Sequence, residues 1–366
     1  MKAKEVVTFI NNHPDINLVA LIYTPWHLNG VKAYIYEQTT KYQKVVNALC
    51  IICKHPDTGY ALSSQDVVDE YVKYAIYEDS KFYEGESVWI DVLQFLKDRF
   101  IKRKSKKGID VLKAAEPAFK FGSVLNNKCK KNIRLIIIDE GVAMYMGTLS
   151  DFNREHSNLV LYYFVRIIKK IMYLSNEVLH YVLLEKDKKG ELQINQQIAD
   201  NYISVFKKHF VCLPNIKIKR KSVVLCTSAW KRECIKNDTD LFVVEKVINI
   251  FQQYNFFIYL KPHPRDTFFA ANLSKKKQIT ILDGSQAIES MFCEDYSPMY
   301  VVSFSSTVLV SAKIFLPNTL PMCLSNLLDR NLIARIYLNE IDRFKATFGS
   351  MCYYPSSFDD IIHKIS

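Results

Sequence analysis

Three short groups of polar residues stand directly after apolar runs of the sequence, and their side chains are suited to catalysis or anion binding. They are Asp139-Glu140-Gly141, Lys261-Pro262-His263-Pro264 and Ser305-Ser306-Thr307. Two adjacent carboxylates repel each other, which raises the pKa of one of them and favours a general base. An imidazole that two prolines hold beside a lysine can neutralise a phosphate leaving group, and hydroxyls at the start of a helix can bind an anion.

Each group also has an ordinary structural explanation. An acid pair after a strand is compatible with a solvated turn, His-Pro recurs at residues 13–14 and 55–56, and Ser or Thr commonly caps helices. Glu289 suits the two hydroxyls of a ribose, but it is equally compatible with a surface position. Residues 238–240 have the spacing of a metal-binding DxD sequence, yet their place at a helix start favours capping.

Strands must position these groups, and the apolar pattern predicts where the strands lie. Apolar runs without alternation are typical of parallel strands that are covered on both faces. Such runs occupy residues 17–23, 44–52, 134–138, 222–226, 256–260, 278–282, 299–302 and 320–323. Helical spacing is found from residue 28, over 89–100, 159–182, 240–254 and 285–292, and from residue 305. The alternation predicts two doubly wound, Rossmann-like α/β halves that bind ligands beyond the carboxyl ends of their strands.

The predicted halves divide the chain near residue 205. Two Rossmann-like domains facing across a cleft form the GT-B fold of glycosyltransferases that use nucleotide sugars, although a fold alone does not assign chemistry. On this interpretation residues 1–205 form an acceptor-side domain and residues 206–340 a donor-binding domain. We expect a helix within residues 341–366 to pack back on the first domain.

Composition limits the compartment and the kind of partner. Of the 366 residues, 49% are hydrophobic and 24% are charged, as in a globular protein, and the formal net charge of +11 favours an anionic partner. The nine cysteines lie mostly in apolar runs, and neither a signal peptide nor a long apolar span is found. We therefore expect a cytoplasmic protein with reduced thiols. Cys50 and Cys53 lack a second pair at metal-binding spacing, so no metal site is predicted.

Taken together and in this order, the three groups resemble the motifs of bacterial sialyltransferases. Those enzymes share an acid-acid-glycine motif, a His-Pro motif and a Ser/Thr pair, and the likeness is strongest to the polysialyltransferases of capsule synthesis. Ile288-Glu289-Ser290 places its glutamate 16 residues before Ser305, as in that group. The loop Tyr23-Thr24-Pro25-Trp26-His27 is similar to an early loop of the lipooligosaccharide sialyltransferases, glycosyltransferase family 52. The likeness covers about residues 133–147 and 222–315.

The resemblance implies a reaction and its substrates. Sialic acid would pass from CMP-sialic acid to a hydroxyl of a bacterial surface glycan, with inversion and without a metal ion or other cofactor. The acceptor would be a lipooligosaccharide or a capsular polysialic acid, and it would be anionic or lipid-linked. The positive charge would also allow peripheral contact with the anionic inner face of the plasma membrane, and no nucleic acid is expected as a partner.

The resemblance also implies a role for each site residue. The catalytic residues would be Glu140 or Asp139 as the base and His263 as the group that neutralises the phosphate. The donor-binding residues would be Lys261, Pro264, Glu289, Ser305, Ser306, Thr307, Thr227 and Ser228. Thr24, His27 and Gly141 would lie on the acceptor side, and Glu233 would be held in reserve as an alternative base.

Two other functions stay open on the residues alone. A CDP-glycerol glycerophosphotransferase of surface-polymer synthesis also uses His-Pro loops and Ser/Thr phosphate sites, but the acid-acid-glycine group favours sialyl transfer. A basic nucleic-acid-binding protein would account for the charge, but no nucleic-acid-binding motif accompanies it.

Overall fold

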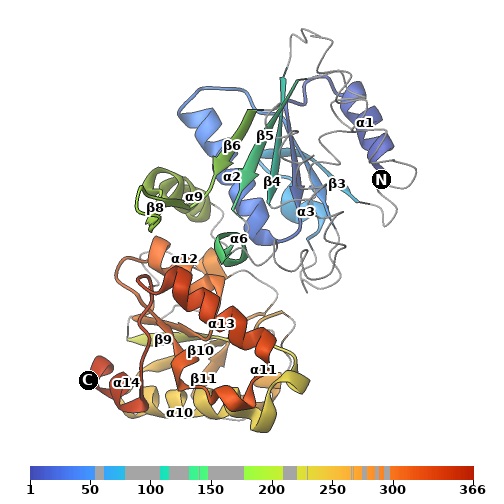
Figure 1. Cartoon of the computed structure of the whole chain (residues 1–366). Helices are drawn as coiled ribbons and strands as arrows, with labels where there is room; N and C mark the ends of the chain where they lie inside the picture. The colour runs from blue at the N-terminus through green and yellow to red at the C-terminus, as the bar shows by residue number, and fades with distance from the viewer. Residues whose placement is uncertain are drawn as a thin grey trace, which may run out of the picture. The chain divides into compact units, whose positions relative to one another are not determined.

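The chain forms two compact units, each with its own parallel sheet (Figure 1). The first unit contains residues 1–184 and 195–205, and the second contains residues 185–194 and 206–366. The computed structural model describes residues 1–53, 62–78, 108–114, 132–139, 141–146, 177–208, 221–228, 230–264, 266, 268–273, 278–284, 288–291 and 297–366. The predicted α/β class with two doubly wound halves is confirmed.

The sheet of the first unit has six parallel strands in the order β3-β2-β1-β4-β5-β6. The strands are β1 (Leu18–Ile22), β2 (Ala48–Ile52), β3 (Val72–Tyr77), β4 (Gly108–Ala114), β5 (Asn132–Ile138) and β6 (Glu177–Tyr181). Every residue of β1 and β2 is buried, as expected for parallel strands with helices on both faces. The strand order reverses between β1 and β4, and ligands of such sheets bind at that reversal.

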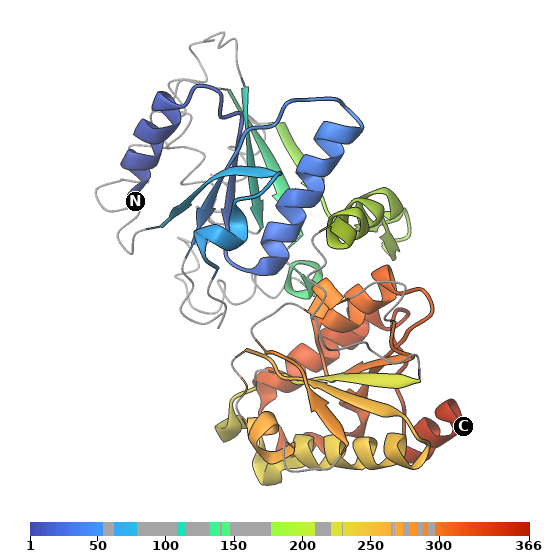
Figure 2. The same cartoon turned by 180° about the vertical axis from the view of Figure 1, so that it is seen from behind.

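The first unit also contains helices of different lengths. They are α1 (Ala3–Asn12), α2 (Pro25–Thr40), α3 (Ser64–Val67), α6 (Val142–Met146) and α9 (Gln196–Lys208). The long helix α2 packs against β1, β4 and β5 (Figure 2). On α1, Val6 and Ile10 join the buried cluster that Val19 and Leu49 form in the sheet.

The second unit has a five-stranded parallel sheet in the order β11-β10-β9-β12-β13. Its strands are β9 (Ser222–Cys226), β10 (Phe257–Lys261), β11 (Ile279–Ile281), β12 (Tyr300–Ser303) and β13 (Leu320–Cys323). A separate two-stranded sheet pairs β7 (Leu184–Lys186) with β8 (Leu192–Ile194). The order of the large sheet reverses between β9 and β12, so the second unit has its own candidate ligand-binding edge there.

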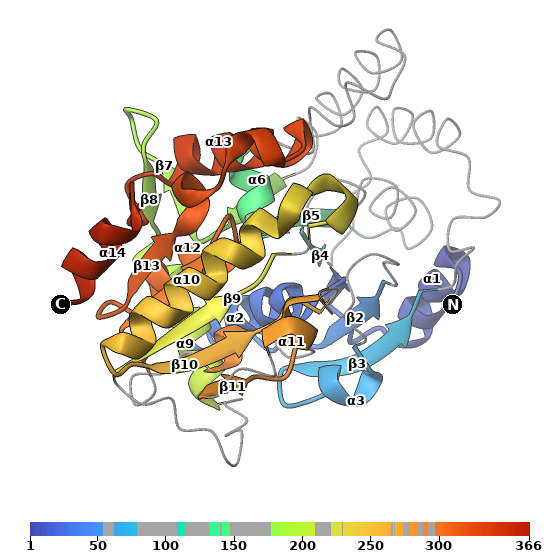
Figure 3. The same cartoon turned by 90° about the horizontal axis from the view of Figure 1, so that it is seen from below.

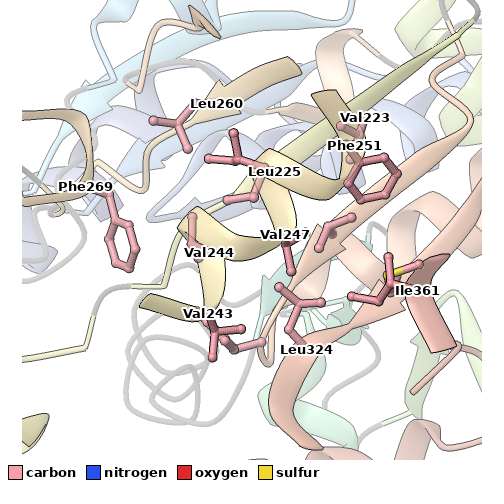
Figure 4. Close-up of a cluster of buried hydrophobic side chains, with 14 of the residues drawn as sticks. Val223, Leu225, Val243, Val244, Val247, Phe251, Leu260, Phe269, Leu324 and Ile361 are labelled. Carbon is pink, nitrogen blue, oxygen red and sulfur yellow. The ribbon is translucent and has the colours of Figure 1, made fainter. Parts of the chain in front are cut away.

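The helices of the second unit enclose a large apolar core. They are α10 (Thr239–Gln253), α11 (Phe268–Leu273), α12 (Thr307–Phe315), α13 (Arg335–Phe348) and α14 (Phe358–Ile365), with short 3₁₀ turns η1 (Arg232–Cys234), η2 (Lys236–Asp238), η3 (Ile288–Met291), η5 (Leu324–Leu327) and η6 (Arg330–Leu332). Seen from below, α10 lies along β9 and β10 (Figure 3). Its apolar face, with Val243, Val247 and Phe251, packs against Val223 and Leu225 of the sheet (Figure 4).

The C-terminal segment belongs to the second unit. Ile341 of α13 and Ile361 of α14 are buried in the core of that unit. The hydroxyl of Tyr300 donates a hydrogen bond of 3.1 Å to the carbonyl of Lys364, which ties the last helix to β12. Residues 341–366 belong to the second unit, where their apolar face completes the core, and the packing of their helix on the first domain stays a prediction.

Some elements differ from their prediction. Residues 177–181 were predicted as part of a helix, but they form β6, because they pair in parallel register with residues 134–138 of β5. Strand β4 was not predicted. The predicted helix at residues 89–100 lies outside the described residues. Within the described part of the chain, no helix is both long enough and apolar enough to cross a membrane.

The contribution of the apolar core of the second unit to stability can be tested by replacing a buried and an exposed isoleucine with alanine. Ile248 on α10 is 1% exposed, whereas Ile336 on α13 is 65% exposed. We expect Ile248→Ala to lower the free energy of unfolding by about 2–5 kcal/mol, because it removes apolar contacts and leaves a cavity. Ile336→Ala should change it by less than about 0.5 kcal/mol. Urea unfolding monitored by tryptophan fluorescence would measure both, and equal effects would contradict this account.

Candidate donor-side and acceptor-side sites

The donor-side residues leave the sheet of the second unit from three neighbouring strands. β9 lies between β10 and β12, with Lys261 paired to Cys226 and Val302 paired to Leu225, so the three strands end at nearly the same level. Neighbouring strands are about 4.8 Å apart, which places the ends of β10 and β12 about 10 Å from each other. The loops that carry His263, Thr227 and Ser305 therefore share one edge, at the reversal of strand order.

The His-Pro loop is tied to the loop after β9. The backbone N–H of His263 donates to the hydroxyl of Thr227 at 2.9 Å, and the N–H of Thr227 donates to the carbonyl of Lys261 at 3.2 Å. Thr227 is 5% exposed, while His263 and Pro264 are half-buried. The hydroxyl of Thr227 thus orients the His263 backbone. The neighbouring hydroxyl of Ser228 is buried and has no hydrogen-bond partner among the described residues.

Lys261 is buried beneath the same loop. It is 6% exposed, and its Nζ donates to the carbonyl of Gly284 at 3.0 Å and to the carbonyl of Pro262 at 3.3 Å. Burial lowers the pKa of Lys261. A Cβ at position 284 would lie 3.3 Å from the Pro262 carbonyl oxygen, so the two loops are packed closely. Lys261 therefore braces the His-Pro loop against the loop after β11.

Glu289 is a buried carboxylate, not a surface residue. It lies on η3, is 7% exposed and accepts a hydrogen bond of 2.9 Å from the hydroxyl of Ser311 on α12. Burial raises the pKa of Glu289, and the hydrogen bond from Ser311 and the charge of Lys261 oppose that shift. The ammonium of Lys261 and this carboxylate are thus electrostatically coupled at one edge of the sheet.

The three hydroxyls after β12 have different surroundings. Ser306 caps α12 and accepts a hydrogen bond from the N–H of Val308 at 3.4 Å, and Thr307 is the first residue of that helix. Ser305 is 9% exposed, and its hydroxyl donates to Glu340 Oε1 at 2.7 Å. The positive end of the α12 dipole lies at this turn, which favours a negatively charged group there.

In the first unit, the carboxylate of Asp139 is surrounded by hydrogen-bond donors. It is 2% exposed. Its Oδ1 accepts hydrogen bonds from the N–H of Gly141 at 2.7 Å and from Trp26 Nε1 at 3.4 Å. Its Oδ2 accepts from the N–H of Leu183 at 3.3 Å and from the Tyr145 hydroxyl. Burial raises the pKa of Asp139, and these hydrogen bonds oppose the shift. Asp139 thus joins the loops that follow β1, β5 and β6.

The first loop of this unit has a fixed geometry. Thr24 caps α2 by accepting a hydrogen bond of 3.4 Å from the N–H of His27. His27 is 6% exposed, and its Nδ1 accepts a hydrogen bond of 3.2 Å from the N–H of Tyr23. This bond places the proton of the neutral imidazole on Nε2. Gly141 has φ of +97°, a conformation that favours glycine, and so permits the sharp exit from β5.

The structure thus groups the predicted residues within each unit. In the second unit it brings the His-Pro loop together with Thr227, Lys261 and Glu289, and in the first it joins Asp139 to the loop of Trp26. Glu140 lies outside the described residues. Glu233 is exposed on η1. Among the described residues, no group of three or more His, Cys, Asp or Glu side chains is arranged to hold a metal ion.

Sequence reasoning missed several residues that hold the site. Ser311 was detectable in principle, because it is a hydroxyl in the otherwise apolar middle of α12, four residues after Thr307. Tyr145 and Glu340 gave no local signal. Their partners lie in other elements, so only the tertiary structure reveals them.

Comparison with known proteins identifies the class of this chain. A family model described as alpha-2,8-polysialyltransferase (POLYST) matches residues 18–324. This is most of the chain, and the protein therefore belongs to the α-2,8-polysialyltransferase family. It is a glycosyltransferase, which uses a nucleotide-sugar donor and a glycan acceptor, as the sequence motifs predicted.

Solved structures with a similar arrangement include both sialyltransferases and epimerases. The α/β-galactoside α-2,3-sialyltransferase from Photobacterium phosphoreum has 11% identity and a TM-score of 0.47, with 93% of this chain and 98% of that chain covered. A sialyltransferase from Photobacterium damsela has 10% identity and a TM-score of 0.48, with 93% and 81% covered. The UDP-GlcNAc 2-epimerase from Methanocaldococcus jannaschii has 13% identity and a TM-score of 0.47, with 95% and 98% covered. Similarities at this level assign no activity. A search of curated protein sequences found no significant match.

The buried state of Glu289 can be tested by its effect on stability. Because burial raises its pKa, the folded protein holds this proton more tightly than the unfolded chain does. Relative to the E289Q variant, wild type is therefore most stable below the unfolded pKa of about 4.3 and loses stability as pH rises through the folded pKa. As pH rises through this range, we expect the free energy of unfolding of E289Q to increase relative to that of wild type by about 1.4 kcal/mol per unit of pKa shift.

Urea unfolding between about pH 5 and about pH 8 would measure this difference. Glu233→Gln is the matched control, because Glu233 is exposed in the same unit. Its difference from wild type should change less with pH than that of E289Q, because the Glu233 side chain is exposed. A difference between E289Q and wild type that stayed constant over this range would contradict the buried state of Glu289.

Proposed function

We propose that this protein transfers sialic acid from CMP-sialic acid to a hydroxyl of a bacterial surface glycan. The observation that carries the proposal is the shared edge of β9, β10 and β12, where a histidine, a buried lysine and a hydroxyl-rich helix start come together. Cationic and hydroxyl groups at one sheet edge suit a nucleotide phosphate. Membership of the polysialyltransferase family supports a sialyl group as the unit transferred.

On the donor side, each group has a distinct task in this proposal. The helix start at Ser306 and Thr307, together with Ser305, holds the phosphate oxygens of CMP. As the bond from the anomeric carbon to the phosphate oxygen breaks, negative charge grows on CMP, and the His263 imidazole neutralises it by a hydrogen bond or a proton. Glu289 accepts hydrogen bonds from the ribose hydroxyls. Lys261 keeps the His-Pro loop in place and adds positive charge beneath it.

On the acceptor side, we assign the base to Glu140. It removes the proton of the acceptor hydroxyl while the acceptor oxygen bonds to the anomeric carbon, in a single displacement with inversion. Asp139 holds the turn beside it, because both its oxygens accept hydrogen bonds within the first unit. Gly141 provides the turn, and Thr24 and His27 fix the adjacent loop.

The charge of the chain supports an anionic acceptor. A formal net charge of +11 would attract polysialic acid or a phosphorylated, lipid-linked glycan, and it would also favour peripheral contact with an anionic membrane surface. The basic runs at residues 102–107, 130–131 and 275–277 lie outside the described residues. In this proposal the phosphate charge is met by protein groups, and no metal ion is required.

The proposed reaction can be tested by offering two donors in parallel. Purified protein would be incubated with CMP-sialic acid or CDP-glycerol, each with a lactose-type and an oligosialic acceptor, with and without a metal chelator. We expect CMP release and a product heavier by one or more sialyl residues, with CMP-sialic acid only and with no loss on chelation. A product from CDP-glycerol alone would overturn the proposal and favour a glycerophosphotransferase.

The role of His263 gives a second test. Removing one prearranged group that meets a developing charge costs about 10²–10³-fold in turnover. We therefore expect His263→Ala to lower kcat by at least that order, with the fold preserved, because the backbone N–H that bonds Thr227 is kept. The matched control is His363→Ala on α14, where the side chain is exposed. Near-normal turnover of the His263→Ala variant would remove this histidine from the mechanism.

A further inference from the structure

Glu340 is a carboxylate at the donor edge that neither the sequence motifs nor the family match includes. It lies on α13, beyond the matched residues 18–324. Its Oε1 accepts a hydrogen bond of 2.7 Å from the hydroxyl of Ser305. A carboxylate directly behind a hydroxyl that is assigned to phosphate is unexpected, because like charges repel. Its position therefore calls for a physical role.

The surroundings hold this carboxylate in place. The Trp230 ring is stacked between Phe304 and Tyr337, with ring centroids at 5.2 Å and 5.4 Å, and its side chain hydrogen-bonds Glu340. The Tyr337 hydroxyl accepts a hydrogen bond of 2.8 Å from the N–H of Lys231. α13 is thus fixed against the loops after β9 and β12, close to Glu340.

A hydroxyl group has a single hydrogen to donate. In this structure the hydrogen of Ser305 is directed at Glu340, so an ionised Glu340 leaves only lone pairs of Ser305 for an incoming phosphate. If Glu340 carries a proton, it donates to Ser305 Oγ instead, and the Ser305 hydrogen can turn to the phosphate. A protonated Glu340 thus donates to Ser305, and Ser305 donates to the phosphate. An ionised Glu340 instead competes with the phosphate for the Ser305 hydrogen.

We propose that Glu340 is a positioning residue that takes up a proton when the donor phosphate binds and so directs the Ser305 hydroxyl to that phosphate. The inference rests on the proposed function, because it takes the Ser305 site as the phosphate site. The proton comes from solvent, and no bond of the donor forms or breaks in this step. Donor binding is thereby coupled to pH through a residue that does not touch the donor.

The electrostatic surroundings agree with this assignment. Glu340 is partly buried, and this burial raises its pKa, while hydrogen bonds from Ser305 and Trp230 oppose the shift. The titratable and charged groups of the packed segments are Lys231, Arg232, Glu233 and Cys234 around η1, Asp329 and Arg330 at η6, and Arg335, Tyr337, Asp342, Arg343 and Lys345 on α13 itself. Arg232 is paired with Asp240, and Lys345 bonds Asn326. The loop 303–306 and η5 contribute no charged residue.

The test measures the binding of cytidine 5′-methyl phosphate by titration calorimetry. This phosphodiester lacks the second phosphate ionisation near pH 6 that CMP has, so its charge is constant over the range used. Histidine side chains in general titrate near neutrality, and the comparison is therefore made in an H263Q background as well as in wild type. Titration in two buffers with different ionisation enthalpies gives the number of protons taken up on binding.

We expect the H263Q protein to take up close to one proton per ligand at pH values between the pKa of free Glu340 and its pKa in the complex. Over that interval its Kd should rise by up to tenfold per pH unit. In H263Q/E340Q the amide donates permanently to Ser305, so the Kd should match the low-pH value at every pH and no proton should be taken up. Glu340→Ala should also bind without pH dependence but more weakly, because nothing then positions Ser305.

The controls separate this inference from the proposed function. Asp359→Asn, which changes an exposed acid on α14 that has no role in the proposed site, should keep the pH slope of its parent. Equal proton uptake with and without E340Q would overturn the inference and leave the donor assignment intact. If wild type failed to bind the cytidine diester at every pH, the proposed donor site would fall, and the inference with it.

Discussion

The parallel hydrogen-bond ladder between β10, β9 and β12 is the constraint on which the proposed donor site depends. Because β9 pairs with both neighbours, the loops after Cys226, Lys261 and Ser303 must leave from the same edge at nearly the same level. The strands themselves are buried and apolar, so chemistry is confined to the residues that follow them. The ladder therefore determines which polar side chains can meet one ligand.

Hydrogen bonds between the loops then refine the positions that the ladder allows. The Ser303 hydroxyl donates to the Cys226 carbonyl at 2.9 Å, and the His263 N–H donates to the Thr227 hydroxyl at the same distance. The first bond joins β12 to β9, and the second joins the loop after β10 to the loop after β9. A histidine held in this way loses little further freedom on binding a substrate, which is the condition for efficient stabilisation of a developing charge.

Buried ionisable groups are concentrated at this edge. Lys261, Glu289 and Glu340 all have pKa values shifted toward their neutral forms by burial. Burying charges in this way costs stability, so their presence together agrees better with a binding or catalytic site than with a stabilising role. Asp139 in the first unit has the same character, but its four donors give it a fixed structural task as well.

The elements that were predicted with correct bounds are buried strands that appear in the sequence as continuous apolar runs. Residues 222–226 and 320–323 were predicted with the bounds of β9 and β13. β4 was missed because it begins with a glycine and carries Asp110 and Lys113. Asp110 is tolerated there because Arg134, its register partner on β5, bonds its Oδ1 at 2.8 Å. Residues 177–181 have helical spacing, but they pair with β5 as a strand. Helix propensity is a weak preference that tertiary pairing overrides.

The sequence alone determined the alternation of strand and helix, the chemical groups placed after the strands, and the family to which those groups point. These are local properties, because a strand end and the polar residue that follows it are neighbours along the chain. The tertiary structure decided which groups meet: Thr227 with His263, Ser311 with Glu289 and Ser305 with Glu340 are 36, 22 and 35 residues apart. Such pairs depend on strand order and helix packing, which no short stretch of sequence encodes, so the roles of Ser311 and Glu340 emerged only when the sheet and α13 were in place.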